Sequence, residues 1–241
     1  MDGGESARSS PPEIAGRLAG VRARIDAACA RAGRSPRDIT LVGVSKQQPA
    51  SAIRAAFDAG LRDFGENRVQ EAAQKIEELR ALGIAPRWHL IGHLQRNKAA
   101  AAISLFDILH SVDSERVAEA IDAHADRRVP VLLEVNVAGE PAKFGVAPAE
   151  LPALAERIGR LPRIELLGLM TVAPQVANPE DVRPVFRRLR ELGDTVGLPE
   201  LSMGMTDDFE VAIEEGSTLV RVGRAIFGAR GEGAAGAAGD T

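Results

Sequence analysis

The chain has 241 residues, of which 45% are apolar, enough for one large domain or two small ones with a substantial core. Its net charge of −4, with no basic cluster interleaved with aromatic residues, argues against nucleic acid as the main partner. A single cysteine, Cys29, excludes an internal disulfide and fits a cytoplasmic protein. No apolar run approaches the roughly 18 residues of a membrane span, so we expect no membrane partner.

Two terminal segments lack large apolar residues, and helical and strand patterns alternate between them. Gly, Ser, Pro and Ala dominate residues 1–12 and 229–241, which we expect to be disordered tails. Helical spacing over 13–33 comes first and is followed by eight strand–helix units. The strands are expected at 40–45, 62–66, 88–91, 107–111, 131–137, 164–172, 200–203 and 218–222. The helices after them are expected at 49–59, 67–82, 95–103, 114–127, 149–159, from 178 onward, 207–215 and 224–227.

This order of elements predicts an α/β fold. The predicted strands are mostly continuous apolar runs, as expected for parallel strands covered by helices. Eight such units in roughly 220 residues are typical of a TIM (β/α)8 barrel. A doubly wound open sheet is the alternative, but it usually carries a glycine-rich loop after its first strand, and Ser45-Lys46-Gln47 has no glycine. We therefore predict one barrel domain over residues 13–228.

The first predicted strand ends in Lys46, although the chain has only four lysines among its 30 basic residues. A lysine amine can form a Schiff base, which an arginine cannot. In a TIM barrel the active site lies at the C-terminal ends of the strands, where Lys46 would be. The alternative is a side chain that extends from a strand end into solvent.

The last two predicted strands carry the features of a phosphate site. In TIM barrels the loops after these strands, with a short following helix, commonly bind phosphate. Gly223 allows a close approach of backbone N–H groups, the turn starting at Arg224 supplies a positive helix end, and Ser202 adds a hydroxyl. A phosphate close to a lysine amine indicates a phosphorylated aldehyde, for which pyridoxal 5′-phosphate (PLP) is the obvious candidate.

Five motifs then give the chain a specific resemblance. They are LVGVSK (41–46), FGENRVQE (64–71), WHLIGHLQRNK (88–98), GLMTV (168–172) and LSMGMTDDFEVAIEEGSTLVRVGRAIFG (201–228). From about Ile14 to Gly228 the chain resembles the YggS/PROSC family of pyridoxal phosphate homeostasis proteins. The resemblance implies an alanine racemase N-terminal domain-like barrel with PLP as cofactor and Lys46 as the Schiff-base lysine.

The same resemblance implies the rest of the cofactor site. Ser202, Gly223 and Arg224 would hold the phosphate, the last two mainly through backbone N–H groups. Arg221 would face the pyridine nitrogen, and Asn67 would lie near the cofactor, although its position fits a helix N-cap equally well. Position 224 is commonly threonine in this family; a backbone contact survives that change, whereas a hydroxyl contact does not.

An arginine facing the pyridine nitrogen has a consequence for the reaction. It stays protonated and so disfavours protonation of the ring, which makes the cofactor a weaker electron sink. Alanine racemases resemble this barrel and use such an arginine, but they also need a second base, a tyrosine from a separate domain. This chain contains no tyrosine. We therefore expect no catalytic residues and a protein that stores, delivers or buffers PLP, with apo PLP-dependent enzymes as recipients.

Two enzymatic alternatives remain open. The first is a PLP-dependent amino-acid racemase of low activity, in which His93 or His110 would replace the missing base. The second is a Schiff-base aldolase without cofactor, which is disfavoured because such barrels commonly carry their lysine on the sixth strand. The predicted sixth strand, 164–172, contains no lysine.

The remaining polar features receive structural interpretations. His89 and His93 have the spacing of helical metal ligands, but they span a strand end and Gly92, so we predict no metal site. Lys143 lies in a long loop and is expected to be solvated. The segment 95–98 has no assigned mechanism. We expect a monomer, because no second domain is present to build a shared active site.

Overall fold

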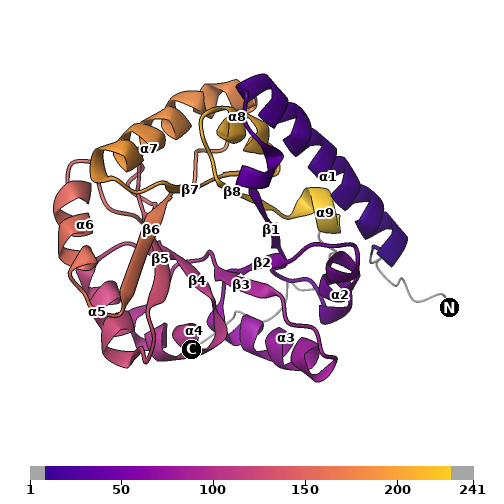
Figure 1. Cartoon of the computed structure of the whole chain (residues 1–241), viewed down its shortest axis with the longest axis horizontal. Coiled ribbons are helices and arrows are strands. Elements are labelled where there is room, and N and C mark those ends of the chain that lie inside the picture. The colour runs from indigo at the N-terminus through magenta and orange to yellow at the C-terminus, as the bar shows by residue number, and fades with distance from the viewer. Residues whose placement is uncertain (1–8, 229–241) are drawn as a thin grey trace.

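Eight parallel strands pair in chain order and close into a barrel in the computed structural model, which describes residues 9–228 (Figure 1). The strands are β1 (Thr40–Val44), β2 (Asp63–Glu66), β3 (Arg87–Leu90), β4 (Ile108–Val112), β5 (Val129–Glu134), β6 (Ile164–Met170), β7 (Glu200–Met205) and β8 (Leu219–Val222). The predicted (β/α)8 barrel is thus confirmed. The expected tail at 229–241, and residues 1–8 of the expected tail at 1–12, lie outside the described residues.

Helices surround the barrel. They are α1 (Pro11–Ala32), α2 (Ala50–Asp58), α3 (Val69–Ala81), α4 (Ala99–Leu105), α5 (Glu115–His124), α6 (Leu151–Gly159), α7 (Arg183–Val196), α8 (Phe209–Glu214) and α9 (Arg224–Phe227). Three short 3-10 helices accompany them: η1 (Pro36–Asp38), η2 (Arg96–Lys98) and η3 (Pro179–Val182). Within residues 9–228, no helix is both long enough and apolar enough to span a membrane.

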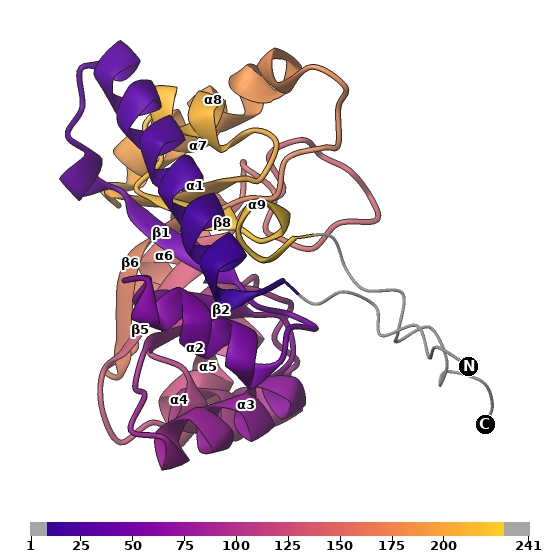
Figure 2. The ribbon, with the colours of Figure 1, turned by 90° about the vertical axis from the view of Figure 1, so that its right-hand side faces the viewer.

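The first helix lies outside the eight strand–helix repeats and covers the place where the barrel closes. It begins at Pro11, two residues earlier than expected, because proline is well tolerated in the first turn of a helix. Its buried face contains Ile14, Leu18, Val21, Ile25 and Cys29, and it packs against α2, α8 and α9. Figure 2 shows α1 running across β1 and β8, the two strands whose pairing completes the sheet.

Several helix starts differ from the predicted ones, and in the following three the local backbone geometry changes. The helix expected at 67–82 begins at Val69, because Arg68 is extended (φ −132°, ψ 129°) and acts as the N-cap. The helix expected at 95–103 is divided into η2 and α4, and the one expected from 178 begins as η3 before α7. In the last case two prolines, Pro179 and Pro184, lie in successive first turns, where they interrupt backbone hydrogen bonding.

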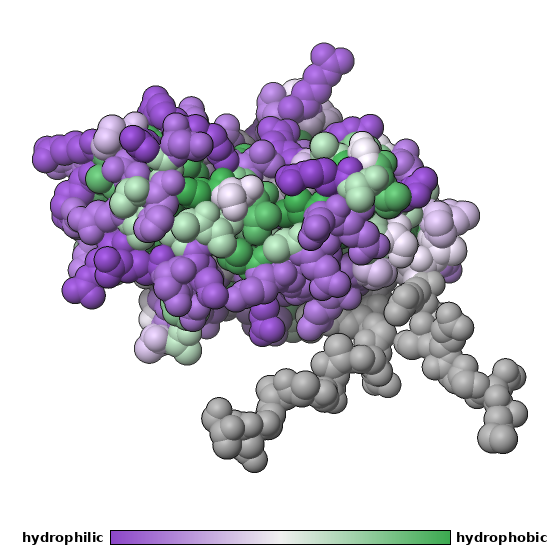
Figure 3. Space-filling view, turned by 90° about the horizontal axis from the view of Figure 1, so that it is seen from below, coloured by the Kyte–Doolittle hydropathy of each residue, from purple (hydrophilic) through white to green (hydrophobic). Residues whose placement is uncertain are grey.

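The outer faces of the strands and the inner faces of the helices form one apolar core, whereas the inside of the barrel is partly polar. Gly168 on β6 shows how tightly the sheet closes: a Cβ there would lie 1.8 Å from the Glu200 backbone oxygen on β7. On the surface seen from below, an apolar band is bordered by hydrophilic side chains (Figure 3). The chemistry-bearing residues lie inside and at the mouth of the barrel.

Candidate cofactor site

Lys46 lies at the C-terminal mouth of the barrel, two residues after β1 ends. Its side chain is half-buried. The parallel pairing of β1 with β8 places this strand end beside the turn at Gly223: a Cβ on Gly223 would be in ordinary contact, 3.4 Å, with Val44 Cβ. The strand end that carries Lys46 and the expected phosphate turn are therefore neighbours, although one follows the first strand and the other the last.

The turn that carries Lys46 has an unusual and well-anchored backbone. Gln47, the next residue, has φ +61°, the only positive φ among the described non-glycine residues. Its N–H donates to Glu71 Oε1 at 2.6 Å, and the Gln48 N–H donates to Ser45 O at 2.9 Å. A non-glycine residue in this conformation persists where surrounding contacts hold it, and strained backbone clusters at functional sites.

A buried ion network lies beneath this turn. Lys75 Nζ donates to Ser45 O at 2.8 Å, to Glu66 Oε1 at 2.8 Å and to Glu71 Oε1 at 2.7 Å. Ser45 Oγ donates to the same Glu66 oxygen at 2.6 Å. Burial raises the pKa of Glu66, and Lys75 opposes that rise. The network attaches the Lys46 turn to β2 and α3.

Sequence reasoning missed this network, although it contained a signal. Lys75 is one of only four lysines in an arginine-rich chain, and it falls on the face of α3 that buries Ala72, Ile76 and Leu79. A buried lysine requires a partner of opposite charge. The scarcity of lysine, which drew attention to Lys46, therefore applies equally to Lys75.

Asn67 follows β2 directly and is half-buried at the mouth. It is not the N-cap of α3, since Arg68 occupies that position. Its backbone packs on Gly92: a Cβ there would lie 2.3 Å from Asn67 O. Asn67 lines a hollow of about 490 Å³ together with Arg68, Gln70, Gly92, His93, Gln95 and Lys98.

Arg221 is buried inside the barrel, with 4% of its surface exposed. Its Nη1 donates to Ser202 O at 2.8 Å and to Ser202 Oγ at 2.5 Å, and its Nη2 donates to Thr171 O at 2.8 Å. Burial lowers its pKa to about 10, whereas the nearby carboxylates of Asp208 and Glu134 raise it. The guanidinium is therefore charged at neutral pH.

The Ser202 side chain lies inside the barrel, which does not suit the phosphate-binding role expected for it. Its side chain is fully buried, and its hydroxyl contacts Arg221 and His110 Nδ1, the latter at 2.9 Å. A second hydroxyl, which sequence reasoning did not select, lies beside the glycine turn instead: the Gly223 N–H donates to Thr206 Oγ1 at 3.4 Å. Thr206 follows the end of β7, so its position after the seventh strand was the available signal.

Gly223 and Arg224 adjoin each other at the start of α9. Gly223 is its N-cap. The Arg224 side chain is exposed and pairs with Asp207 Oδ2 at 2.5 Å. A side chain engaged in this surface ion pair leaves the backbone N–H as the group that Arg224 offers to the mouth.

Glu134, at the end of β5, is a buried carboxyl that sequence reasoning also missed. Burial, together with the like charge of Asp113, raises its pKa to about 7, and Arg221 acts in the opposite direction. Because β5 lies opposite β1 in the strand order, Glu134 lies across the barrel from the Lys46 turn. It adds a titratable group that interacts with Arg221.

The four histidines occupy three different environments. His89 and His110 are fully buried inside the barrel and contact each other. His93 at the mouth pairs with Asp113 at 3.4 Å and stacks on Phe144, with ring centroids 3.8 Å apart. His124 donates from Nδ1 to Ala120 O on α5. Among residues 9–228, no group of three potential metal ligands comes together.

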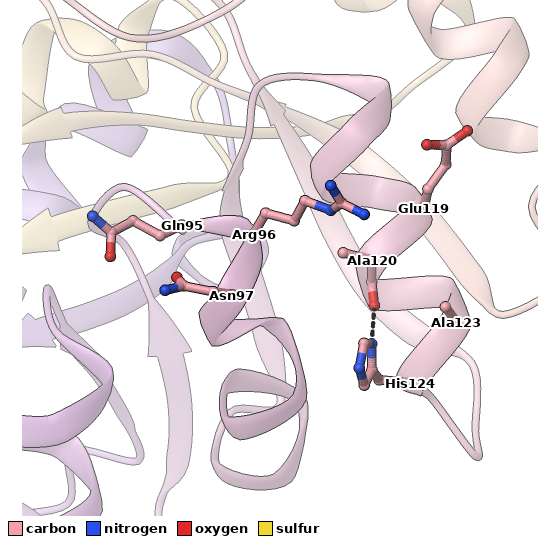
Figure 4. Close-up of a pocket in the computed structure, with 7 residues that line it drawn as sticks. All are labelled: Gln95, Arg96, Asn97, Glu119, Ala120, Ala123 and His124. Carbon is pink, nitrogen blue, oxygen red and sulfur yellow. Dashed lines mark hydrogen bonds between the residues drawn. The ribbon is translucent and has the colours of Figure 1, made fainter.

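The structure bears on two further segments, the loop with Lys143 and residues 95–98. It corrects the expectation that Lys143 is solvated. Lys143 is partly buried and engaged: it pairs with Glu140 at 2.5 Å and donates to Val172 O at 3.3 Å. The segment 95–98 separates the hollow beside Asn67 from a surface groove of about 760 Å³ between η2 and α5 (Figure 4). In that groove the Arg96 side chain extends toward α5, away from Gln95 and Asn97.

The chain shares its sequence and fold with proteins of one group. The family described as "Alanine racemase, N-terminal domain" matches residues 17–231. A pyridoxal phosphate homeostasis protein from Aquifex aeolicus is 48% identical over 223 residues, covering 89% of this chain and 97% of that protein. One from Pseudomonas aeruginosa is 47% identical over 226 residues, covering 92% and 97%.

Solved structures agree with this grouping. PipY of Synechococcus elongatus, whose structure has PLP bound, superposes with a TM-score of 0.78 at 40% identity, covering 89% of this chain and all of PipY. Alanine racemase from Corynebacterium glutamicum shares the fold, with a TM-score of 0.66 at 21% identity, covering 94% of this chain and 63% of the racemase.

The fold and the matched domain place the chain in the class of alanine racemase N-terminal domain-like barrels. Within that class, the chain belongs to the pyridoxal phosphate homeostasis protein family.

Removal of the Lys75 charge tests the ion network. We expect Lys75→Met to lower the free energy of unfolding by about 3 kcal/mol, because Glu66 is left buried without its cation. Adding Glu66→Gln should restore part of this loss. Urea unfolding of both variants measures the effect, with Arg54→Met as a control, since its exposed pair with Asp58 should contribute at most about 0.5 kcal/mol. Equal losses in Lys75→Met and Arg54→Met would contradict the network.

The raised pKa of Glu134 predicts a pH dependence of stability. Its folded pKa of about 7 lies above the usual 4.5, so the folded state holds a proton that the unfolded chain releases. The resulting stabilisation, up to about 3 kcal/mol, is present at acidic pH and is lost as the pH rises through 7. Urea unfolding across this range should show the slope in the wild type and not in Glu134→Gln. The exposed Glu77→Gln serves as control and should keep the slope.

Proposed function

We propose that this protein binds PLP at the barrel mouth, as a Schiff base on Lys46, and acts in PLP homeostasis. The single observation that carries the proposal is the adjacency of Lys46 to the Gly223 turn across the β1–β8 pairing. In the proposed site, the amine of Lys46 lies beside backbone N–H groups that suit a phosphate. PipY, 40% identical, supports it, because its structure has PLP bound.

The residues present fit this cofactor. The Gly223 and Arg224 N–H groups with the Thr206 hydroxyl form a set of phosphate-binding groups, and Thr206 replaces Ser202 in this role, since the Ser202 hydroxyl is engaged inside the barrel. Arg221 would face the pyridine nitrogen, and Asn67 would border the ring. When bound, PLP supplies an aldehyde that condenses with an amine.

We propose storage and delivery rather than efficient catalysis. Arg221, charged and held by three hydrogen bonds, disfavours protonation of the pyridine ring. A racemase needs a second base, and the chain has no tyrosine. His110 is unsuited, because it is fully buried and both its nitrogens lie within hydrogen-bond distance of a partner. The two relatives described above are named for homeostasis and not for an enzymatic activity.

A weak racemase is the second candidate, and His93 is the residue that would support it. It is exposed at the mouth and pairs with Asp113. Deuterium exchange into amino acids, measured in wild type and His93→Gln, distinguishes the two functions.

The homeostasis proposal further includes transfer of PLP to apo PLP-dependent enzymes by a cytoplasmic monomer.

The absorption spectrum tests the Schiff base directly. PLP added to the purified protein should give an imine band that borohydride bleaches, and peptide mapping should find the pyridoxyl group on Lys46. Lys46→Ala should lose the band, whereas Lys98→Ala, which changes a lysine in the hollow beside Asn67, should keep it. An imine at full occupancy in Lys46→Ala would refute the assignment.

Two hydroxyl variants identify the phosphate ligand. We expect Thr206→Val, which keeps the shape of the side chain, to weaken PLP binding about tenfold and to leave the binding of unphosphorylated pyridoxal unchanged. Ser202→Ala should weaken both ligands equally, because it acts through Arg221. Titrations followed by absorption give the four affinities. If Ser202→Ala weakened the binding of PLP alone and Thr206→Val weakened both ligands equally, Ser202 would be the phosphate ligand instead.

A further inference from the structure

A chain of buried hydrogen bonds crosses the inside of the barrel and ends at Arg221. Arg221 Nη1 lies 2.5 Å from Ser202 Oγ, which lies 2.9 Å from His110 Nδ1. His110 Nε2 lies 2.9 Å from His89 Nδ1, and His89 Nε2 lies 3.0 Å from Asp63 Oδ1. The five residues come from β8, β7, β4, β3 and β2, and all are buried.

The two ends of this chain determine where its hydrogens lie. Arg221 can only donate, and an ionised Asp63 can only accept. Asp63 is ionised because Arg87 Nε pairs with the same oxygen at 2.6 Å. His89 must then donate from Nε2, which leaves its Nδ1 as an acceptor. His110 consequently donates from Nε2 and accepts at Nδ1, so Ser202 donates to it.

The reverse direction requires an extra proton on His89. Both its nitrogens would then donate, and His110 would donate to Ser202. That arrangement places a third positive charge between Arg87 at one end of the chain and Arg221 at the other. Asp63 does not compensate this extra charge, because its own charge is already paired with Arg87. At the Arg221 end, the carboxylates of Glu134 and Asp208 raise the pKa of the guanidinium. Burial, the neighbouring His89 and the charge of Arg221 all lower the pKa of His110. The chain with two neutral histidines is therefore the stable one.

We propose that Asp63, His89 and His110 are positioning residues for Arg221, joined in a hydrogen-bond chain of fixed direction. The chain turns the Ser202 hydrogen toward His110, so that the serine offers Arg221 only a lone pair. Together with Ser202 O and Thr171 O, this acceptor fixes the plane of the guanidinium. The negative charge of Asp63 polarises every bond in the same sense and so strengthens the Ser202 acceptor.

This inference rests on the proposed function, because it assigns the chain a role toward the pyridine nitrogen of bound PLP. It adds that the residue facing the ring is held from the opposite end of the barrel. A change at Asp63, which belongs to the start of β2, should then alter the cofactor at the mouth without touching it.

Nitrogen-15 NMR of the histidine rings in the full, cofactor-free chain tests the direction. The chain has only four histidines, and His93 and His124 are exposed. We expect His89 and His110 each to carry one proton, on Nε2, at neutral pH. A buried ring that carries its proton on Nδ1, or on both nitrogens at neutral pH, would overturn the proposal.

Asp63→Asn tests whether the direction matters for the cofactor. The amide can donate as well as accept, so the chain loses the charge that selects one direction. We expect mixed histidine tautomers, a shifted imine absorption band and PLP binding weakened about fivefold. His124→Gln, a histidine outside the barrel, is the matched control and should change none of these. Unchanged tautomers and an unchanged imine band in a folded Asp63→Asn would refute the inference.

The wild-type measurements separate this inference from the proposed function. A wild type that shows the expected tautomers and forms no imine with PLP would refute the proposed function alone. A wild type that forms the imine and shows the wrong tautomers would refute the hydrogen-bond chain alone. If Asp63→Asn does not fold, the spectrum of the wild type still decides the direction.

Discussion

The pairing of β1 with β8 is the interaction on which the rest of the structure depends. It joins the first strand to the last, and it does so in parallel, so that both strand ends reach the same mouth. Parallel pairing demands helical crossovers between all the strands, which the eight strand–helix units supply. Without that single ladder, Lys46 and Gly223 would belong to two open edges of a sheet.

The barrel contains two charged networks where an ordinary core would be apolar. One, centred on Lys75, lies under the Lys46 turn, and the other ends at Arg221. Buried charges are costly unless opposite charges and hydrogen bonds compensate them. Each network meets that requirement: one holds the backbone of the turn that carries Lys46, and the other ends at the Arg221 side chain. Their placement indicates that the interior is organised to orient the mouth, more than to maximise stability.

The fold was accessible from the sequence because its signals are local and repeated. Continuous apolar strands, helix stops at glycine and eight units of similar length all point to one architecture. The positions of Lys46, Asn67, Arg221, Gly223 and Arg224 at or near the mouth followed from the same pattern, since each follows or ends a strand.

The details that were missed depend on contacts between elements and not on the pattern within one element. Ser202 and Thr206 both belong to the end of the seventh unit, and a strand pattern does not say which hydroxyl is engaged inside the barrel. His89 and His110 lie 21 positions apart, and the register of the β3–β4 pairing brings their rings together. The partners of Lys75 come from a strand, a turn and its own helix, a combination that no periodicity reveals.

Closure also determines when the site can exist. During synthesis Lys46 leaves the ribosome early, whereas Gly223 follows the last of the eight strands, so the long-range β1–β8 ladder forms late in folding. The helix that crosses this seam, α1, likewise waits for α8 and α9 before its apolar face is covered. A ligand that spans the seam binds only the closed barrel and so stabilises it by mass action. Binding of such a ligand therefore indicates that the barrel has closed, and it also stabilises the closed barrel.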